Sequence, residues 1–271
     1  MKENIGSLSD WIESRELRGY YTFTKDEIEK QFPSASKVYI KTALHRLTSK
    51  AKIISPWRNF YVIMPIEYSL KGVIPPVFYM DQLMSYLDRK YYVSLLNAAA
   101  FYGASHQRVQ SFSVTVELPY MRNTSKNGTS ILFFSKKEIQ SDFIRKHKTQ
   151  TGYINVSSPE LTAIDLIENE KNVGGLNRVC SVLNELVDAM DLNSLSAKFF
   201  KVSSIPAFQR FGYILEHILE REDLSELFYT KMRTSGLKYR KIPFKIGKST
   251  EGCKINDKWK VIINQEIEID E

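Results

Sequence analysis

The sequence predicts an α+β protein: a winged helix-turn-helix domain over residues 1–67, a linker at 68–78 and a larger mixed α/β domain over 79–271. Three observations lead to this prediction. Helical apolar spacing followed by a β-hairpin pattern fills the first domain. A stretch with Gly and Pro, SLKGVIPP, marks the linker. Helical and alternating strand patterns then interleave, which is typical of a small sheet covered by helices.

The composition is that of a folded protein rather than a disordered one, with 43% hydrophobic and 25% charged residues in a chain of 271. The two cysteines, Cys180 and Cys253, lie far apart without metal-ligand spacing. This favours a reducing cytosol over a disulfide scaffold or a zinc finger. The N-terminus lacks a signal peptide's apolar segment, and no apolar run approaches the roughly 18 residues of a membrane span. We therefore expect a cytoplasmic protein with no membrane partner.

The first domain is expected to contain three helices. The first covers residues 7–18 and ends at Gly19. Its inward side chains are Leu8, Trp11, Ile12 and Leu17. Thr24 followed by Glu27 is a capping box that starts the second helix, and Pro33 stops it. A third helix begins after a short turn, so the later helix of the pair is placed as in a helix-turn-helix.

The third helix starts near Ser34 or Ser36, runs to Lys52 and has two unlike faces. Its inward stripe consists of Ile40, Ala43, Leu44, Leu47 and Ala51. The candidate DNA-contacting residues on its outer side are Lys37, Lys41, Thr42, His45, Arg46, Ser49 and Lys52. No acid occurs between Glu29 and Glu67. Such a face suits a helix that enters a DNA groove, although a lone basic helix is more often a solvated surface helix.

A hairpin is expected directly after the third helix, in the run IISPWRNFYVIM. The turn signal covers Pro56 to Asn59 and places Arg58 at the tip. A hairpin in this position is a wing, and a basic residue at its tip can reach a phosphate or the minor groove. The order of elements therefore predicts binding to double-stranded DNA.

The second domain is expected to hold a buried helix over 91–102 and a small sheet. The other expected helices are one that Asp81 caps and that ends at Arg89, one that Ser158 caps with Pro159 in its first position, and those over 176–190, 194–200 and 207–219. The expected strands are 110–118, 130–134, 151–156 and a final one within 258–270 that returns to the sheet, with a polar loop at 123–128.

A second basic run without acids lies between Glu226 and Glu251. Its candidate surface residues are Lys231, Arg233, Lys238, Arg240, Lys241 and Lys245, and Phe228, Tyr229, Tyr239 and Phe244 lie among them. Charge with aromatic side chains indicates a second nucleic-acid surface. A surface that acts on a toxin or its RNA substrate and a solvated connector are the alternatives. Charge reversal of Arg240 and Lys241 is expected to weaken binding if the run contacts nucleic acid.

The sequence predicts no enzyme: we expect no catalytic residue, metal site or cofactor. It contains no P-loop, GxGxxG or HExxH motif, and its histidines lack metal-ligand spacing. Asp165 lies among apolar residues and is expected to be a buried structural carboxylate bonded to a backbone group. Cys180 lies on an amphipathic helix without a neighbouring base and is expected to serve packing.

Several stretches follow one another in an order that resembles the AbiEi antitoxin family of bacterial type IV toxin–antitoxin, abortive-infection and phage-defence systems. They are YYVSLLNAAAFYGASHQ, INVSSPELTAIDLI, GGLNRVCSVLNEL, AFQRFGYILEHIL and DKWKVIIN, behind the winged helix. The resemblance implies a transcriptional autorepressor that binds inverted repeats in its own promoter. It also implies antagonism of a nucleotidyltransferase-like toxin, AbiEii, without a stable complex.

By resemblance, the recognition-helix role falls to Lys37, Lys41, Thr42, His45 and Arg46, and the wing role to Arg58. Two other functions remain open from the residues alone. One is a DNA-binding transcriptional regulator whose second domain binds a ligand or a protein, with no toxin involved. The other is a nuclease that a winged helix targets to DNA, although the sequence lacks paired strand-borne carboxylates for it.

Overall fold

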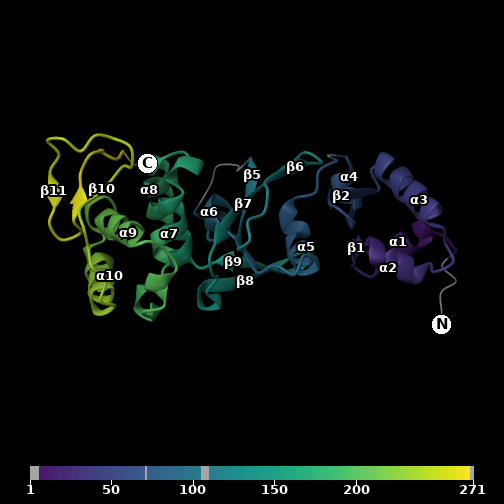
Figure 1. Ribbon diagram of the computed structural model, residues 1–271, viewed down its shortest axis with the longest axis horizontal. Coiled ribbons are helices and arrows are strands. Elements are labelled where there is room, and N and C mark those ends of the chain that lie inside the picture. The colour runs from purple at the N-terminus through teal and green to yellow at the C-terminus, as the bar shows by residue number, and fades with distance from the viewer. Residues whose placement is uncertain (1–5, 71, 105–109, 269–271) are drawn as a thin grey trace. The chain divides into compact units, whose positions relative to one another are not determined.

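The computed structural model describes residues 6–70, 72–104 and 110–268, and it confirms the α+β class (Figure 1). The chain forms two compact units. The first comprises Met1–Tyr91, Gln110–Ser135 and Lys146–Asn155, and the second comprises Tyr92–Val109, Lys136–Arg145 and Val156–Glu271. Among the described residues, no helix is long and apolar enough to cross a membrane.

The first unit begins with three helices and a three-stranded sheet in the order expected of a winged helix-turn-helix. These elements are α1 (Leu8–Leu17), β1 (Thr22–Thr24), α2 (Lys25–Gln31), α3 (Lys37–Ser49), β2 (Ile53–Trp57) and β3 (Phe60–Ile63). The sheet has the order β1-β3-β2, with antiparallel pairs throughout. The shared core contains Trp11, Phe23, Ile28 and Leu44, among others.

Local side-chain hydrogen bonds start each of these helices where the sequence predicts. The capping box of α2 is confirmed, because the Thr24 hydroxyl accepts from the Glu27 amide and the Glu27 carboxylate accepts from the Thr24 amide. Ser36 caps α3 by accepting from the Tyr39 amide at 3.1 Å. Two inward positions are wrong. Leu17 is 90% exposed because helical spacing puts it opposite the core of α1, and Ala51 is exposed because it follows the end of α3 at a φ of 51°.

The hairpin after α3 has a shorter turn than its sequence suggests. The β2 strand runs through Pro56 and Trp57, and a bulge between Ile54 and Trp57 accommodates the proline. The turn is therefore Arg58 and Asn59 alone, and the positive φ of 61° at Asn59 suits a two-residue hairpin loop.

The chain from α4 (Ile66–Ser69) through a 3₁₀ turn (Pro76–Phe78) to α5 (Met80–Tyr86) includes the expected linker. This stretch packs into the first unit, since Ile74 is fully buried; residue 71 of the expected linker lies outside the described residues. Asp81 does not cap α5, because it lies in the first turn and accepts a hydrogen bond of 2.8 Å from the hydroxyl of Tyr91.

A six-stranded sheet has the strand order β6-β7-β5-β4-β9-β8. Its strands are β4 (Tyr91–Val93), β5 (Ser111–Glu117), β6 (Thr124–Lys126), β7 (Thr129–Lys136), β8 (Ile144–Thr149) and β9 (Gly152–Ser157). The prediction of one helix over 91–102 is wrong: β4 comes first, and α6 (Leu95–Phe101) follows a break at Leu95, whose φ is 55°. The polar loop at 123–128 holds β6 and a hairpin turn at Asn127-Gly128, a pair that favours positive φ.

The second unit is mainly helical. Besides α6, its helices are α7 (Pro159–Glu168), α8 (Leu176–Leu186), α9 (Ile205–His217) and α10 (Glu222–Thr234). Figure 1 shows α9 beside α10, and α7 packs against α6, α8 and α9. The cap at Ser158 and the proline in the first position of α7 are confirmed.

Two predictions for the second unit are wrong. Residues 194–200 form no α-helix; 3₁₀ turns at Leu192–Ser194 and Phe199–Lys201 occupy that stretch, because Phe199 and Phe200 both point into the core. The final strand does not return to the six-stranded sheet. It is β12 (Val261–Ile262), which pairs with β10 (Ile242–Pro243) and β11 (Ile255–Asn256) in a separate sheet.

Candidate nucleic-acid interface

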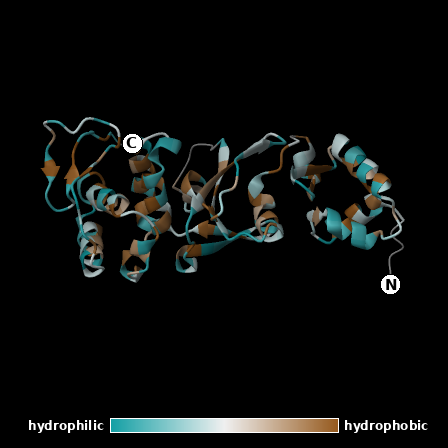
Figure 2. Cartoon of the chain, in the orientation of Figure 1, coloured by the Kyte–Doolittle hydropathy of each residue, from teal (hydrophilic) through white to brown (hydrophobic). Residues whose placement is uncertain are grey.

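The burial of one face of α3 fixes which side chains the helix presents outward. Ile40, Leu44 and Leu47 are at most 5% exposed and pack in the core that α3 shares with α1. All the outward candidate residues are exposed: Lys37, Lys41, Thr42, His45, Arg46 and Ser49. Hydrophilic and hydrophobic residues accordingly alternate along α3 in Figure 2. The structure therefore brings these six residues together on one side of one helix.

Acidic residues of the first two helices form ion pairs with basic residues outside this face. Arg15 pairs with Glu27 and Lys25 with Glu29, each at 3.2 Å. Lys52 lies 3.6 Å from Glu13 of α1, so the structure places it beside α1 rather than with the outward face of α3. Within the described part of the chain, Lys37, Lys41 and Arg46 have no ion-pair partner. Their charge is therefore available to an anionic ligand.

Two residues that the sequence reasoning left out share the outward face. Val38 is 74% exposed and Tyr39 is 48% exposed, both in the first turn of α3. Val38 stands four residues before Thr42 and seven before His45, so these side chains form one stripe along the helix. The spacing of Val38 is visible in the sequence, but a selection based on charged and polar residues does not include an apolar one. The N-terminal turn of a recognition helix is the part that contacts base edges.

Arg58, the residue predicted at the tip of a wing, is exposed in the turn between β2 and β3. Its neighbour Trp57 is half-buried, and the indole ring meets Phe133 edge-on at 6.4 Å between centroids. The hydroxyl of Ser55 donates to the carbonyl oxygen of Trp57 at 2.9 Å. These contacts hold the base of the turn and leave the guanidinium of Arg58 outside the core.

The second basic run is only partly available for binding. Lys231 donates to the carbonyls of Asn193 and Leu195 at 2.6 and 2.9 Å, and Lys245 pairs with Glu170 at 2.5 Å. Both lysines therefore fasten the fold. Of the six candidate residues, the exposed ones are Arg233, Lys238, Arg240 and Lys241.

The aromatic residues of the second run belong mainly to the core. Phe228 and Phe244 are at most 1% exposed, so neither ring is free to stack on a base. Tyr229 packs against Trp259, with ring centroids 5.2 Å apart, and carries the guanidinium of Arg233 above its face at 5.8 Å. A stacking platform of the kind that single-stranded nucleic acid uses is therefore weaker here than the sequence suggests.

Asp165, one of the buried carboxylates of the second unit, is held by side chains among the described residues, so the expected backbone bond is wrong. An Asp165 oxygen lies 2.6 Å from the ammonium of Lys136, and the other accepts from the Tyr92 hydroxyl at 2.8 Å. Burial raises the pKa of Asp165, and the ammonium and the hydroxyl oppose that rise. Lys136 also donates to the carbonyl of Val202 at 2.9 Å. Asp165 is 2% exposed, so this pair joins β7 to α7 within the core.

The other candidate chemical groups are likewise engaged or buried. Glu160 accepts from the Asp191 amide at 2.7 Å. Cys180 packs in the core as expected, and burial raises the pKa of its thiol to about 12, which disfavours the nucleophilic thiolate. Among the described residues, no three His, Cys, Asp or Glu side chains gather where they could hold a metal ion.

These features define a class: an α+β protein in which a basic three-helix segment precedes a domain built around buried helices. Residues 92–217 match the model of the AbiEi antitoxin C-terminal domain. This part of the chain is therefore similar to the C-terminal domain of AbiEi antitoxins. The matched domain is of the antitoxin type found in toxin–antitoxin and abortive-infection systems, and its family is regulatory rather than enzymatic.

A crystal structure of the RV2827C protein from Mycobacterium tuberculosis is similar to this chain, with a TM-score of 0.67 and 11% identity over 94% of this chain and 90% of that chain. At that identity the likeness shows the fold alone. A crystal structure of an antigenic nucleotidyltransferase-like protein from Paracoccidioides brasiliensis aligns with a TM-score of 0.37 and 11% identity, over 57% of this chain and 91% of that chain. That alignment carries no argument. No curated protein matches the sequence.

Proposed function

We propose that this protein is an antitoxin and a transcriptional autorepressor that binds inverted repeats in its own promoter and acts in the cytoplasm against a nucleotidyltransferase-like toxin. The observation that carries the DNA-binding half is the outward face of α3. There Lys37, Lys41 and Arg46 are exposed and have no ion-pair partner among the described residues, and Thr42 and His45 lie between them. Phosphates compensate such charges, and the polar side chains can read base edges.

The contacts divide by position along the first unit. In this proposal α3 lies in the major groove and Lys37 faces a phosphate. The side chains toward the bases are Val38, Thr42, His45 and Arg46. Arg58 reaches the backbone or the minor groove from the turn of the wing. Domain limits at residues 67 and 79 remain part of the proposal. The exposed residues Arg233, Lys238, Arg240 and Lys241 are a second, independent candidate for backbone contacts.

The antitoxin half rests on the family of residues 92–217. In this proposal the protein counteracts its toxin without a stable complex, so no docking surface for the toxin is required. A regulator with a ligand-binding second domain and no toxin is the alternative. An adjacent gene for a nucleotidyltransferase-like protein favours the first function.

Two experiments test the two halves separately. A gel-shift titration of the purified chain should show specific binding to the promoter upstream of its own gene and weaker binding to a scrambled duplex. The logarithm of the affinity should fall with the logarithm of salt concentration by roughly 0.9 per phosphate contacted. For the other half, the neighbouring toxin is expressed with and without the antitoxin in a host cell. Growth that the antitoxin does not restore contradicts the antagonism.

A further inference from the structure

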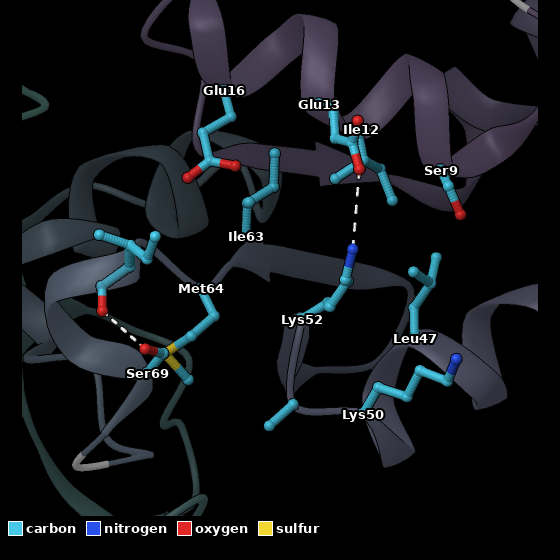
Figure 3. A pocket seen from close by; sticks show the side chains of 12 residues that line it. Ser9, Ile12, Glu13, Glu16, Leu47, Lys50, Lys52, Ile63, Met64 and Ser69 are labelled. Carbon is cyan, nitrogen blue, oxygen red and sulfur yellow. Dashed lines mark hydrogen bonds and ion pairs between the residues drawn. The ribbon is translucent and has the colours of Figure 1, made fainter.

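The first unit has a groove between α1, the end of α3 and α4, with a volume of about 280 Å³ (Figure 3). Its floor is apolar and includes Ile12, Leu47 and Ile63. Figure 3 shows Glu13 of α1 and Lys52 facing one another across it, 3.6 Å apart. An apolar floor inside a charged rim is the composition of a protein–protein contact, so the groove suits side chains that protrude from a protein surface.

Protruding apolar side chains stand beside this groove on the same unit. Ile66, on the rim of the groove, is 87% exposed, and Leu70, directly after α4, is 97% exposed. The two are four residues apart, which puts them on one side of that helical turn. Leu17 at the end of α1 is 90% exposed next to the rim residue Glu16. The surface therefore carries both a hollow and the side chains that could fill one.

The charges around the groove are also self-complementary, because both signs occur on the same patch. Glu13 and Glu16 come from α1, and Lys50 and Lys52 come from the end of α3 and the chain just after it. Among the described residues Lys50 has no ion-pair partner. An acidic side and a basic side on one patch complement each other when two identical patches meet about a twofold axis. A partner of a single charge sign would match only half of this rim.

We propose that this groove is a contact between two copies of the chain. Ile66 and Leu70 of each copy enter the groove of the other, and Glu16 of each copy faces Lys50 of the other. The inference rests on the proposed function in one respect, because an inverted repeat places two copies side by side on DNA. The outward residues of α3 that are proposed to contact DNA are not used in the contact, so both interactions are compatible.

Charge exchange at the rim tests the contact specifically. Self-association of the full chain is measured by sedimentation over a concentration series, without DNA, for wild type, Glu16→Lys and Lys50→Glu. Each single variant places like charges opposite one another twice, and self-association should weaken by about tenfold or more. An equimolar mixture of the two variants restores both opposite-charge contacts, so it should associate about as strongly as wild type.

Substitution of the protruding residues gives a second reading. Ile66→Glu combined with Leu70→Glu should abolish self-association, because charged side chains cannot enter an apolar groove. Ile246→Glu, at a half-exposed position in the second unit, is the matched control and should leave association unchanged. Wild type that stays monomeric at every concentration, or a variant mixture that stays as weak as its components, overturns the proposal.

DNA with a single half-site keeps this test apart from the proposed function. Variants at the groove should bind one half-site as wild type does and lose only the cooperative binding of a second copy. A chain that self-associates but binds no specific DNA contradicts the proposed function and leaves the contact standing. A chain that binds each half-site independently, with no self-association, contradicts the contact alone.

Discussion

The ion pair between Lys136 and Asp165 makes the most quantitative prediction from the structure. Replacing Lys136 by Met keeps the unbranched aliphatic part of the side chain and removes the charged ammonium group. The Asp165 carboxylate, 2% exposed, is then left with the hydroxyl of Tyr92 as the hydrogen-bond donor that the structure shows. Breaking a buried pair in this way typically costs about 3–5 kcal/mol.

The cost has a limit that depends on pH, because the stranded carboxyl group can take up a proton. An unfolded Asp has a pKa of about 3.9, so protonating it at pH 7 costs about 4 kcal/mol and at pH 5 about 1.5 kcal/mol. The lost hydrogen bond to the carbonyl of Val202 adds about 1 kcal/mol at either pH. In the variant the folded-state pKa of Asp165 lies well above the unfolded value. The penalty is therefore small at low pH and grows as the pH rises through that interval.

Equilibrium urea unfolding of Lys136→Met and wild type at pH 5 and pH 7 measures this difference. The transition of the second unit is the one to follow. Burial already raises the pKa of Asp165 in the wild type, so the variant should lose more stability at pH 7 than at pH 5 by at most about 2–3 kcal/mol. Lys137→Met, at the exposed neighbouring position, is the control and should change stability by less than about 0.5 kcal/mol. An equal loss at both pH values would refute the reasoning, because it would assign the effect to packing rather than to an unpaired carboxylate.

Three further predictions concern other parts of the molecule. Gly212→Ala should destabilise the second unit by about 1–3 kcal/mol in thermal unfolding, because the added carbon would lie 2.0 Å from the ring of Trp259. A gain in stability, which is the usual result of this substitution in a helix, would contradict this packing. Burial opposes ionisation of Glu216, but bonds from Lys258, Trp259 and Ser225 lower its pKa overall, so its stabilisation is present above the unfolded pKa of about 4.3 and is lost as the pH falls through the lower folded value. Glu216→Gln should flatten that loss in unfolding experiments below pH 5, and an unchanged acid limb counts against it. Replacing operator thymines by deoxyuridine should weaken DNA binding of the wild type by about 1 kcal/mol where Val38 touches a methyl group. The same replacement should leave DNA binding of the Val38→Ser variant unchanged, and equal sensitivity of both proteins rejects the contact.

In the first unit, short-range sequence patterns predict most of the secondary structure. The capping box at Thr24 and Glu27, the cap at Ser36 and the apolar stripe of α3 depend on residues at most a few turns apart. Spacing alone therefore located the helices and the outward face of α3. The same spacing shows why the inward prediction for Leu17 is wrong. Leu17 is apolar, but it lies on the side of the helix away from Leu8 and Trp11.

The second unit depends on pairings between distant residues, and there the sequence was less informative. The YYV run at 91–93 is apolar enough for a buried helix, and its place beside β9, with Val93 opposite Val156, decides for a strand. Likewise, β8 contains Arg145, Lys146 and Lys148, which hide its alternation from a reading of hydrophobicity. The partners of Lys231 and Lys245 lie 36 to 75 residues away, so no local pattern could show that these lysines are structural.

The most direct test of the central claim is a comparison of two α3 variants on operator and scrambled DNA. If α3 reads DNA, Arg46→Ala should weaken operator binding by roughly 1–3 kcal/mol where Arg46 contacts a base, with little change on scrambled DNA. Lys37→Ala should weaken both duplexes alike and reduce the salt slope by about 1, as expected for a phosphate contact. Wild-type affinity for the operator in both variants, at matched salt, would contradict the account and remove α3 from the DNA interface.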